Sequence, residues 1–160
     1  MASQFVTFLL IFALGLAMVV VVNDIFSGLT DQMRDSASKP EIEDIITGLK
    51  TTVIDSYLLI KNGEEGSITV ALDKLPTRLS GQYPYEITSF AKDIDDNGTL
   101  DVYYLNLTVD KITKRETITV STGLTVEEVD LSINLRSIVT THYLTTAKTS
   151  TGIAIKLDDS

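Results

Sequence analysis

The first 22 residues of the chain carry no ionisable side chain. They read MASQFVTFLLIFALGLAMVVVV, and the first charged residue is Asp24. An α-helix of this length is about 33 Å long, enough to cross a hydrocarbon core of roughly 30 Å. The helix is apolar on every side, so lipid or other apolar helices must surround it. A cleaved secretory signal would have a basic start and a small-residue cleavage site, and neither is evident here. We therefore predict a retained hydrophobic helix.

The composition excludes several classes of protein. The chain has 160 residues, with 13 Lys and Arg against 22 Asp and Glu, for a net charge of −9. A nucleic-acid binder needs a basic face, so nucleic acid is not expected as the primary partner. There is no cysteine, and His142 is the single histidine, which leaves little from which to build a zinc site or a Ser-His-Asp triad. We predict a protein that is not an enzyme and has no small-molecule substrate.

Helical periodicity continues beyond the uncharged run. Ile25, Leu29 and Met33 recur every four residues, which predicts that the first helix extends to about residue 35. Residues 1–35 are therefore expected to form a hydrophobic helix. The C-terminal bulk of the chain is expected outside the membrane, because no cluster of Lys and Arg follows the span.

Residues 36–62 predict either a continuation of that helix or a second helix. Ser38 and Glu41 have the spacing of a capping box, and Pro40 lies where a first helical turn tolerates it. These residues fit the start of a second helix or a kink in one long helix. An apolar stripe follows as far as Ile60, and Asn62-Gly63 is expected to end the helix.

From Gly66 onward the period of the pattern changes to two. Short alternating segments rich in Val, Thr and Tyr are separated by polar turns, with no helix between them. This predicts an α+β chain in which residues 63–160 form an antiparallel, immunoglobulin-like β-sandwich head. The expected strands are 66–72, 85–88, 100–109, 116–122, 129–139, 141–147 and 152–157.

One loop resembles the first part of a calcium-binding loop. Residues 93–101 read DIDDNGTLD and place oxygen ligands from Asp93, Asp95, Asn97 and Asp101 around a central glycine. Position 12, where a bidentate glutamate would complete such a loop, is Tyr104. Because Asn-Gly is also a strong signal for a two-residue hairpin turn, a hairpin tip without metal stays the alternative to a weak calcium site. No other cofactor is expected.

Two Asn-x-Thr triplets, at Asn97 and Asn106, are candidates for glycosylation on an external domain. The alternation around Asn106 places it on the solvated face of a strand if Tyr103, Leu105 and Leu107 point inward.

The layout of the whole chain resembles archaeal type IV pilins and archaellins. The segments that carry the resemblance are Ala2–Val22, Ile25–Met33 and the strands after Gly66, together with Leu75-Pro76, Gly81 and Tyr85-Glu86-Ile87. Many type IV pilins have a glutamate at the fifth residue of the mature chain, where this chain has Phe5 or, counted from Ala2, Val6. The leader peptide of the family, with its basic residues and processing site, is not seen here.

The resemblance implies a structural subunit of an extracellular filament, in which the helices form the core and the β heads form an outer sheath. The chain would then lie in the membrane before assembly, and its main partner would be other copies of itself in a helical homopolymer. The alternative is a membrane-anchored surface or archaellum-accessory protein whose β head binds a partner. Adhesion, motility, DNA uptake and bundling all fit such a filament. The expected assembly residues are Phe5, Phe8, Leu9, Phe12, Leu14, Gly15, Leu16 and Val19.

Overall fold

The computed structural model describes residues 2–73, 75–80, 82–111, 114–138 and 141–159. The chain divides into two compact units, Met1–Ala37 and Ser38–Ser160. We call the second one the sheet unit. The predicted α+β fold is confirmed: a long hydrophobic N-terminal helix is followed by two four-stranded sheets packed against each other.

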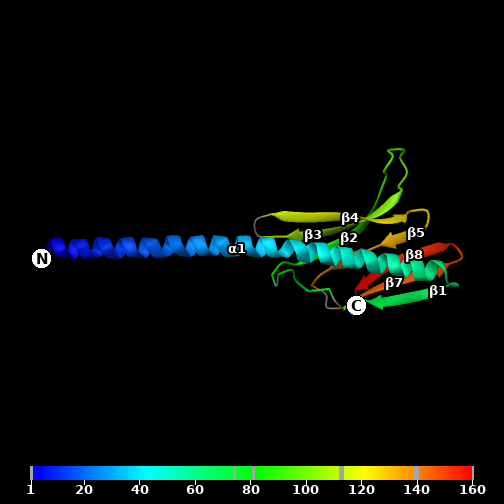
Figure 1. The fold of residues 1–160 in the computed structure, drawn as a ribbon, viewed down its shortest axis with the longest axis horizontal. Coiled ribbons are helices and arrows are strands. Elements are labelled where there is room, and N and C mark those ends of the chain that lie inside the picture. The colour runs from blue at the N-terminus through cyan, green and yellow to red at the C-terminus, as the bar shows by residue number, and fades with distance from the viewer. Residues whose placement is uncertain (1, 74, 81, 112–113, 139–140, 160) are drawn as a thin grey trace. The chain divides into compact units, whose positions relative to one another are not determined.

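A single helix, α1 (Ala2–Lys61), spans the whole region for which the sequence left one or two helices open (Figure 1). Pro40 lies inside it rather than in the first turn of a second helix. Ser38 is fully buried, and the Glu41 carboxylate accepts hydrogen bonds from the Ser80 N–H and hydroxyl at 2.6 and 3.3 Å. Because the helix continues through this point, its backbone needs no cap there, and Glu41 instead binds a distant loop.

The first sheet has the strand order β1-β7-β8-β5. Its strands are β1 (Gly66–Ala71), β7 (His142–Thr149), β8 (Gly152–Asp159) and β5 (Val129–Ser132). The pairs β1–β7 and β7–β8 are antiparallel, as predicted, whereas β5 runs parallel to β8. The parallel pair arises because the chain enters β5 from the other sheet rather than through a hairpin.

The second sheet has the order β4-β3-β2-β6, and all of its pairs are antiparallel. Its strands are β4 (Arg115–Thr125), β3 (Val102–Asp110), β2 (Tyr85–Lys92) and β6 (Asn134–Arg136). The single strand expected over residues 129–139 is wrong, because β5 and β6 belong to different sheets. The chain changes sheets at Ile133, where the Ser89 hydroxyl donates to the Leu131 carbonyl and accepts from the Ile133 N–H.

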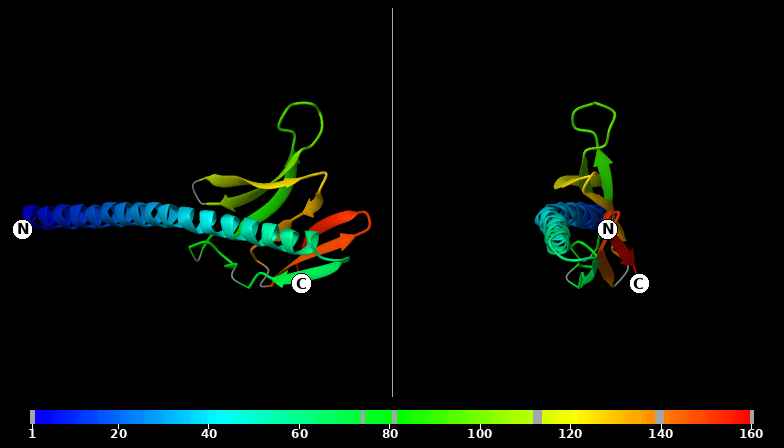
Figure 2. Two further views of the ribbon diagram at one scale, coloured as in Figure 1. Left: turned by 45° about the vertical axis from the view of Figure 1, so that its right-hand side comes forward. Right: turned by 90° about the vertical axis from the view of Figure 1, so that its right-hand side faces the viewer.

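The core of the sheet unit lies between the two sheets and the last part of α1. Residues 38–61 of α1 run beside the strands of both sheets (Figures 1 and 2). The predicted apolar stripe of this segment is buried, and fully buried strand residues such as Leu105, Leu107 and Leu144 meet it. The helix residues in the core are Ile42, Ile46, Leu49, Val53 and Tyr57.

Candidate functional sites

The N-terminal unit consists of a helix whose apolar side chains are exposed on every side. All large apolar residues from Phe5 to Met33 are between 48% and 73% exposed. The expected assembly residues Phe5, Phe8, Leu9, Phe12, Leu14, Leu16 and Val19 are among them. A Cβ added to Gly15 would meet no atom within 4 Å, so this glycine leaves open space beside the helix. The structure places these residues on an open surface that water cannot cover favourably.

By length and composition, α1 is the one helix of the described residues that could cross a membrane. None of its apolar window is buried within the chain. The core helix of a soluble protein would instead bury such a window against its own fold. This helix therefore suggests membrane insertion or secretion. Its exposed apolar surface is stable only in contact with lipid or with other apolar polypeptide.

The acidic loop of residues 93–101 connects β2 to β3 and is held by its own hydrogen bonds. The Asp93 carboxylate accepts from the Gly98 N–H at 2.7 Å, and the Asp101 carboxylate accepts from the Ile94 N–H at 2.7 Å. Gly98 has a φ of 85°, which favours glycine there and was implied by the calcium-loop pattern. Strands, not the helices of an EF-hand, flank the loop.

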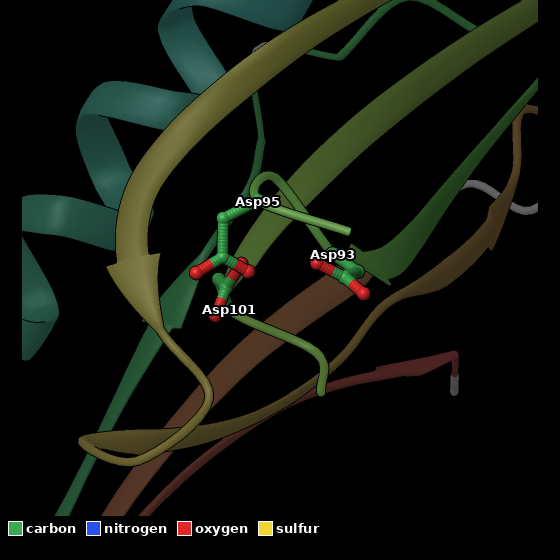
Figure 3. A group of neighbouring side chains, drawn as sticks. All are labelled: Asp93, Asp95 and Asp101. Carbon is green, nitrogen blue, oxygen red and sulfur yellow. The ribbon is translucent and has the colours of Figure 1, made fainter. Parts of the chain in front are cut away.

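Three of the four predicted calcium ligands lie together. One carboxylate oxygen from each of Asp93, Asp95 and Asp101 lies within 4.8 Å of the other two (Figure 3). Asp93 Oδ1 is shielded from solvent and has no hydrogen-bond partner among the described residues. Burial tends to raise the pKa of Asp93, but hydrogen bonds, that from Gly98 foremost, lower it below the usual value. The Asp93 carboxyl is therefore ionised near neutral pH.

The fourth predicted ligand, Asn97, is engaged within the loop. Its amide nitrogen donates to Asp95 at 2.9 Å, and its amide oxygen accepts from the Thr99 N–H at 2.8 Å and from the Thr99 hydroxyl. Tyr104, at the position of the missing glutamate, lies on β3 and stacks on Phe90 with ring centroids 5.6 Å apart. The loop thus offers three carboxylates in one place. The expected two-residue Asn-Gly turn is wrong, because the pairing of β2 with β3 ends at Lys92 and Val102 and all of residues 93–101 form the loop between them.

The two glycosylation candidates differ in their surroundings. Asn106 lies in the middle of β3, and its neighbours Tyr103, Leu105 and Leu107 point inward as predicted. The Asn106 side chain is half-buried on the outer face and accepts from the Thr119 hydroxyl at 2.5 Å. Asn97 is exposed at the loop but carries the hydrogen bonds described above. Glycosylation of either stays a prediction.

Two features of the sheet unit were not anticipated from the sequence. His142 is buried in β7, because it faces the same side of that strand as the buried Leu144. Lys111 and Glu116 form a buried ion pair at the turn from β3 to β4, with Nζ and Oε2 2.6 Å apart. Their separation by five residues could have indicated a hairpin contact, but nothing in the local pattern predicts burial.

Comparisons with known proteins identify no relative. No protein-family model matches the chain, and no curated protein or solved structure matches it significantly. A long apolar N-terminal helix followed by β-sheets is nevertheless a pilin-like architecture.

Proposed function

We propose that this protein is a structural subunit of an extracellular, type IV pilus-like filament and acts by assembly rather than by catalysis. The observation that carries the proposal is the apolar surface of α1 between Phe5 and Met33, which is exposed on every side of the helix. Such a surface is stable in lipid, and it is equally stable among copies of itself once lipid is removed. The same helix can therefore serve as a membrane anchor before assembly and as a filament core afterwards.

The folded sheet unit supports this assignment. It buries its own core, and its acidic, threonine-rich exterior is compatible with water. A bundle of apolar helices surrounded by such units would separate the two kinds of surface. Repetition of one heterologous contact between copies produces an open helical filament rather than a closed ring when the rotation does not close.

The proposal is tested by shearing cells that express the chain. The expected result is that the protein leaves with surface filaments, which electron microscopy of the sheared material would show. If the protein instead stays in the membrane fraction and no filament carries it, the proposal is wrong. That outcome would favour the alternative of a membrane-anchored surface protein whose sheet unit binds a partner.

A substitution in α1 tests the role of the helix. Leu14→Lys places an ammonium group among apolar helices, where an unpaired buried charge costs at least several kcal/mol. We expect it to abolish filaments while the sheet unit keeps its fold. The matched control is Leu14→Ile, which keeps the apolar character and volume and should assemble normally. Normal filaments from the lysine variant would exclude this helix surface from the core.

A further inference from the structure

The two sheets have four edge strands, and two of these are protected against pairing. β5 and β6 have only four and three residues, and each carries an exposed charge, Asp130 in β5 and Arg136 in β6. Short length and exposed charge are the usual means by which edge strands avoid adding another strand. These two edges are therefore poor sites for contact with another chain.

The other two edges, β1 and β4, lack this protection. Residues 66–71 of β1 and 117–121 of β4 contain neither a charge nor a proline, and the bulge of β4 lies beyond Ser121. Within the described part of the chain, β1 pairs only with β7 and β4 only with β3, so each has a free row of backbone donors and acceptors. Both edges also have the same local pattern, Ser67-Ile68-Thr69-Val70 in β1 and Thr117-Ile118-Thr119-Val120 in β4.

The inward-facing residues on both edges are incompletely covered. Ile68 and Val70 in β1, and Ile118 and Val120 in β4, are only half-buried. On the inner strands the equivalent side chains, such as Leu105 and Leu144, are fully buried. Space also remains between β1 and α1, where a groove of about 430 Å³ is lined by residues that include Ile45, Gly48 and Val70. A further strand beside each edge would complete the burial of its apolar side chains.

The positions of the two edges suit contact between neighbouring copies. β1 and β4 lie on opposite sides of residues 38–61 of α1 (Figures 1 and 2). β4 runs in the same direction as this part of α1, and two contacts show it. At the start of β4, the pKa of Glu116 is lowered in part by the charge of Lys39, near the beginning of the segment. Just beyond the end of β4, Glu128 accepts a hydrogen bond from Lys61, at the end of the segment, at 3.0 Å.

β1 runs in the opposite direction to the helix. It begins shortly after α1 ends, and its last residues line the groove against Ile45 and Gly48. A second copy that is rotated about an axis parallel to this helix segment, and shifted along that axis, would therefore present its β1 antiparallel to β4. Antiparallel pairing is the more stable arrangement.

We propose that the β4 edge of one subunit pairs with the β1 edge of a second copy of this chain, joining their sheets. The contact is heterologous, because it uses two different strands, and its repetition produces an open helical array when the rotation does not close into a ring. The alternation in both strands sets the register in steps of two residues, with Thr facing out and Ile and Val facing in. This inference rests on the proposed filament and specifies how its outer units touch.

The test is disulfide cross-linking in assembled filaments, since the chain has no cysteine of its own. Thr119→Cys is combined in turn with Ser67→Cys, Thr69→Cys and Ala71→Cys, which sample three registers on the outward face of β1. Each single variant serves as a control. A further control combines Thr108→Cys with Thr145→Cys, which face outward on the inner strands β3 and β7 and are not at an edge. Filaments are imaged, oxidised and then run on a non-reducing gel.

We expect a ladder of covalent dimers, trimers and larger species from at least one edge combination, reversed by reductant, while all controls stay monomeric. Filaments that form but give no ladder in any register would overturn the edge pairing and leave the filament proposal intact. A covalent dimer from a single-cysteine variant would also overturn it, because it would place like edges together. If the cysteine-free chain forms no filaments, the filament proposal fails, and the edge pairing fails with it.

Discussion

Lys111 Nζ lies 2.6 Å from Glu116 Oε2, and their side chains are 1% and 15% exposed. The pair joins the end of β3 to the start of β4 and lies near Lys39 of α1, whose charge acts on Glu116. A buried ion pair gains little over a well-packed apolar pair, because both charges lose their hydration. Removal of one partner is far more costly, since it leaves the other charge buried and uncompensated.

We therefore predict that Glu116→Gln destabilises the sheet unit by about 3 kcal/mol, which corresponds to a decrease in Tm of roughly 10 °C. The double variant Lys111→Met with Glu116→Leu removes both charges and should recover most of the loss. The measurement is thermal unfolding of the chain in detergent, followed by the near-ultraviolet circular dichroism of its buried tyrosines. A double variant as unstable as the single one would show that the cost comes from packing rather than from an unpaired charge.

The same pair predicts how stability depends on pH. Contact with Lys111 lowers the pKa of Glu116 below its ordinary value of 4.5, and burial offsets only part of this effect. The folded state therefore releases this proton more readily than the unfolded state. The resulting stabilisation is complete above pH 4.5 and is lost as the pH falls through the lower pKa of the folded protein.

Unfolding measured in steps between pH 7 and pH 3 should accordingly show a loss of stability that begins as the pH falls below 4.5. The double variant Lys111→Met with Glu116→Leu lacks this contribution, so its stability should fall less steeply over the same interval. Identical slopes for the two proteins would exclude Glu116 as a source of the acid sensitivity.

The sequence predicted the features that depend on local pattern. The uncharged run predicted the helix, and the change from a period near four to a period of two predicted the sheets. The alternation in β3 predicted that Tyr103, Leu105 and Leu107 point inward. The glycine of the acidic loop was also interpreted correctly, because its left-handed φ is a local requirement.

Contacts between distant segments could not be predicted in the same way. The division of residues 129–136 between two sheets depends on Ser89, more than 40 residues away. Glu41 binds Ser80 instead of capping a helix, because burial of Ser38 and Ile42 in the sheet unit keeps the helix continuous past Pro40. In both places tertiary packing overrides a plausible local signal.

The sheet unit should fold without the N-terminal helix. A chain that starts at Ser36 loses every exposed apolar residue from Phe5 to Met33 but keeps all of the core. We expect it to be soluble, monomeric and rich in β-structure, as measured by gel filtration and far-ultraviolet circular dichroism. Precipitation would indicate that the exposed Leu58 and Leu59, or the open strand edges, need a neighbouring copy. Leu58→Gln with Leu59→Gln would distinguish these two causes.

The acidic loop provides the last prediction. Asp93, Asp95 and Asp101 each hold one carboxylate oxygen within 4.8 Å of the other two, and their mutual repulsion favours a cation. With no glutamate at the twelfth position, the expected affinity for calcium is in the weak extracellular range, with a Kd of roughly 10⁻⁴–10⁻³ M. At a hundredfold excess over Kd, bound calcium would stabilise the folded chain by about 2.7 kcal/mol.

Calcium at 10 mM, about tenfold above the weak end of that range, should therefore raise the Tm of the chain, and chelator should reverse the increase. Asp95→Asn removes one charge while it keeps the shape of the side chain, so the response to calcium should shrink. Asp130→Asn, on β5 outside the loop, removes the same charge elsewhere and should respond like the unmodified chain. A Tm that is equal in chelator and in calcium would instead support a metal-free loop, held by its own hydrogen bonds such as those from Gly98 and Ile94 to the carboxylates of Asp93 and Asp101.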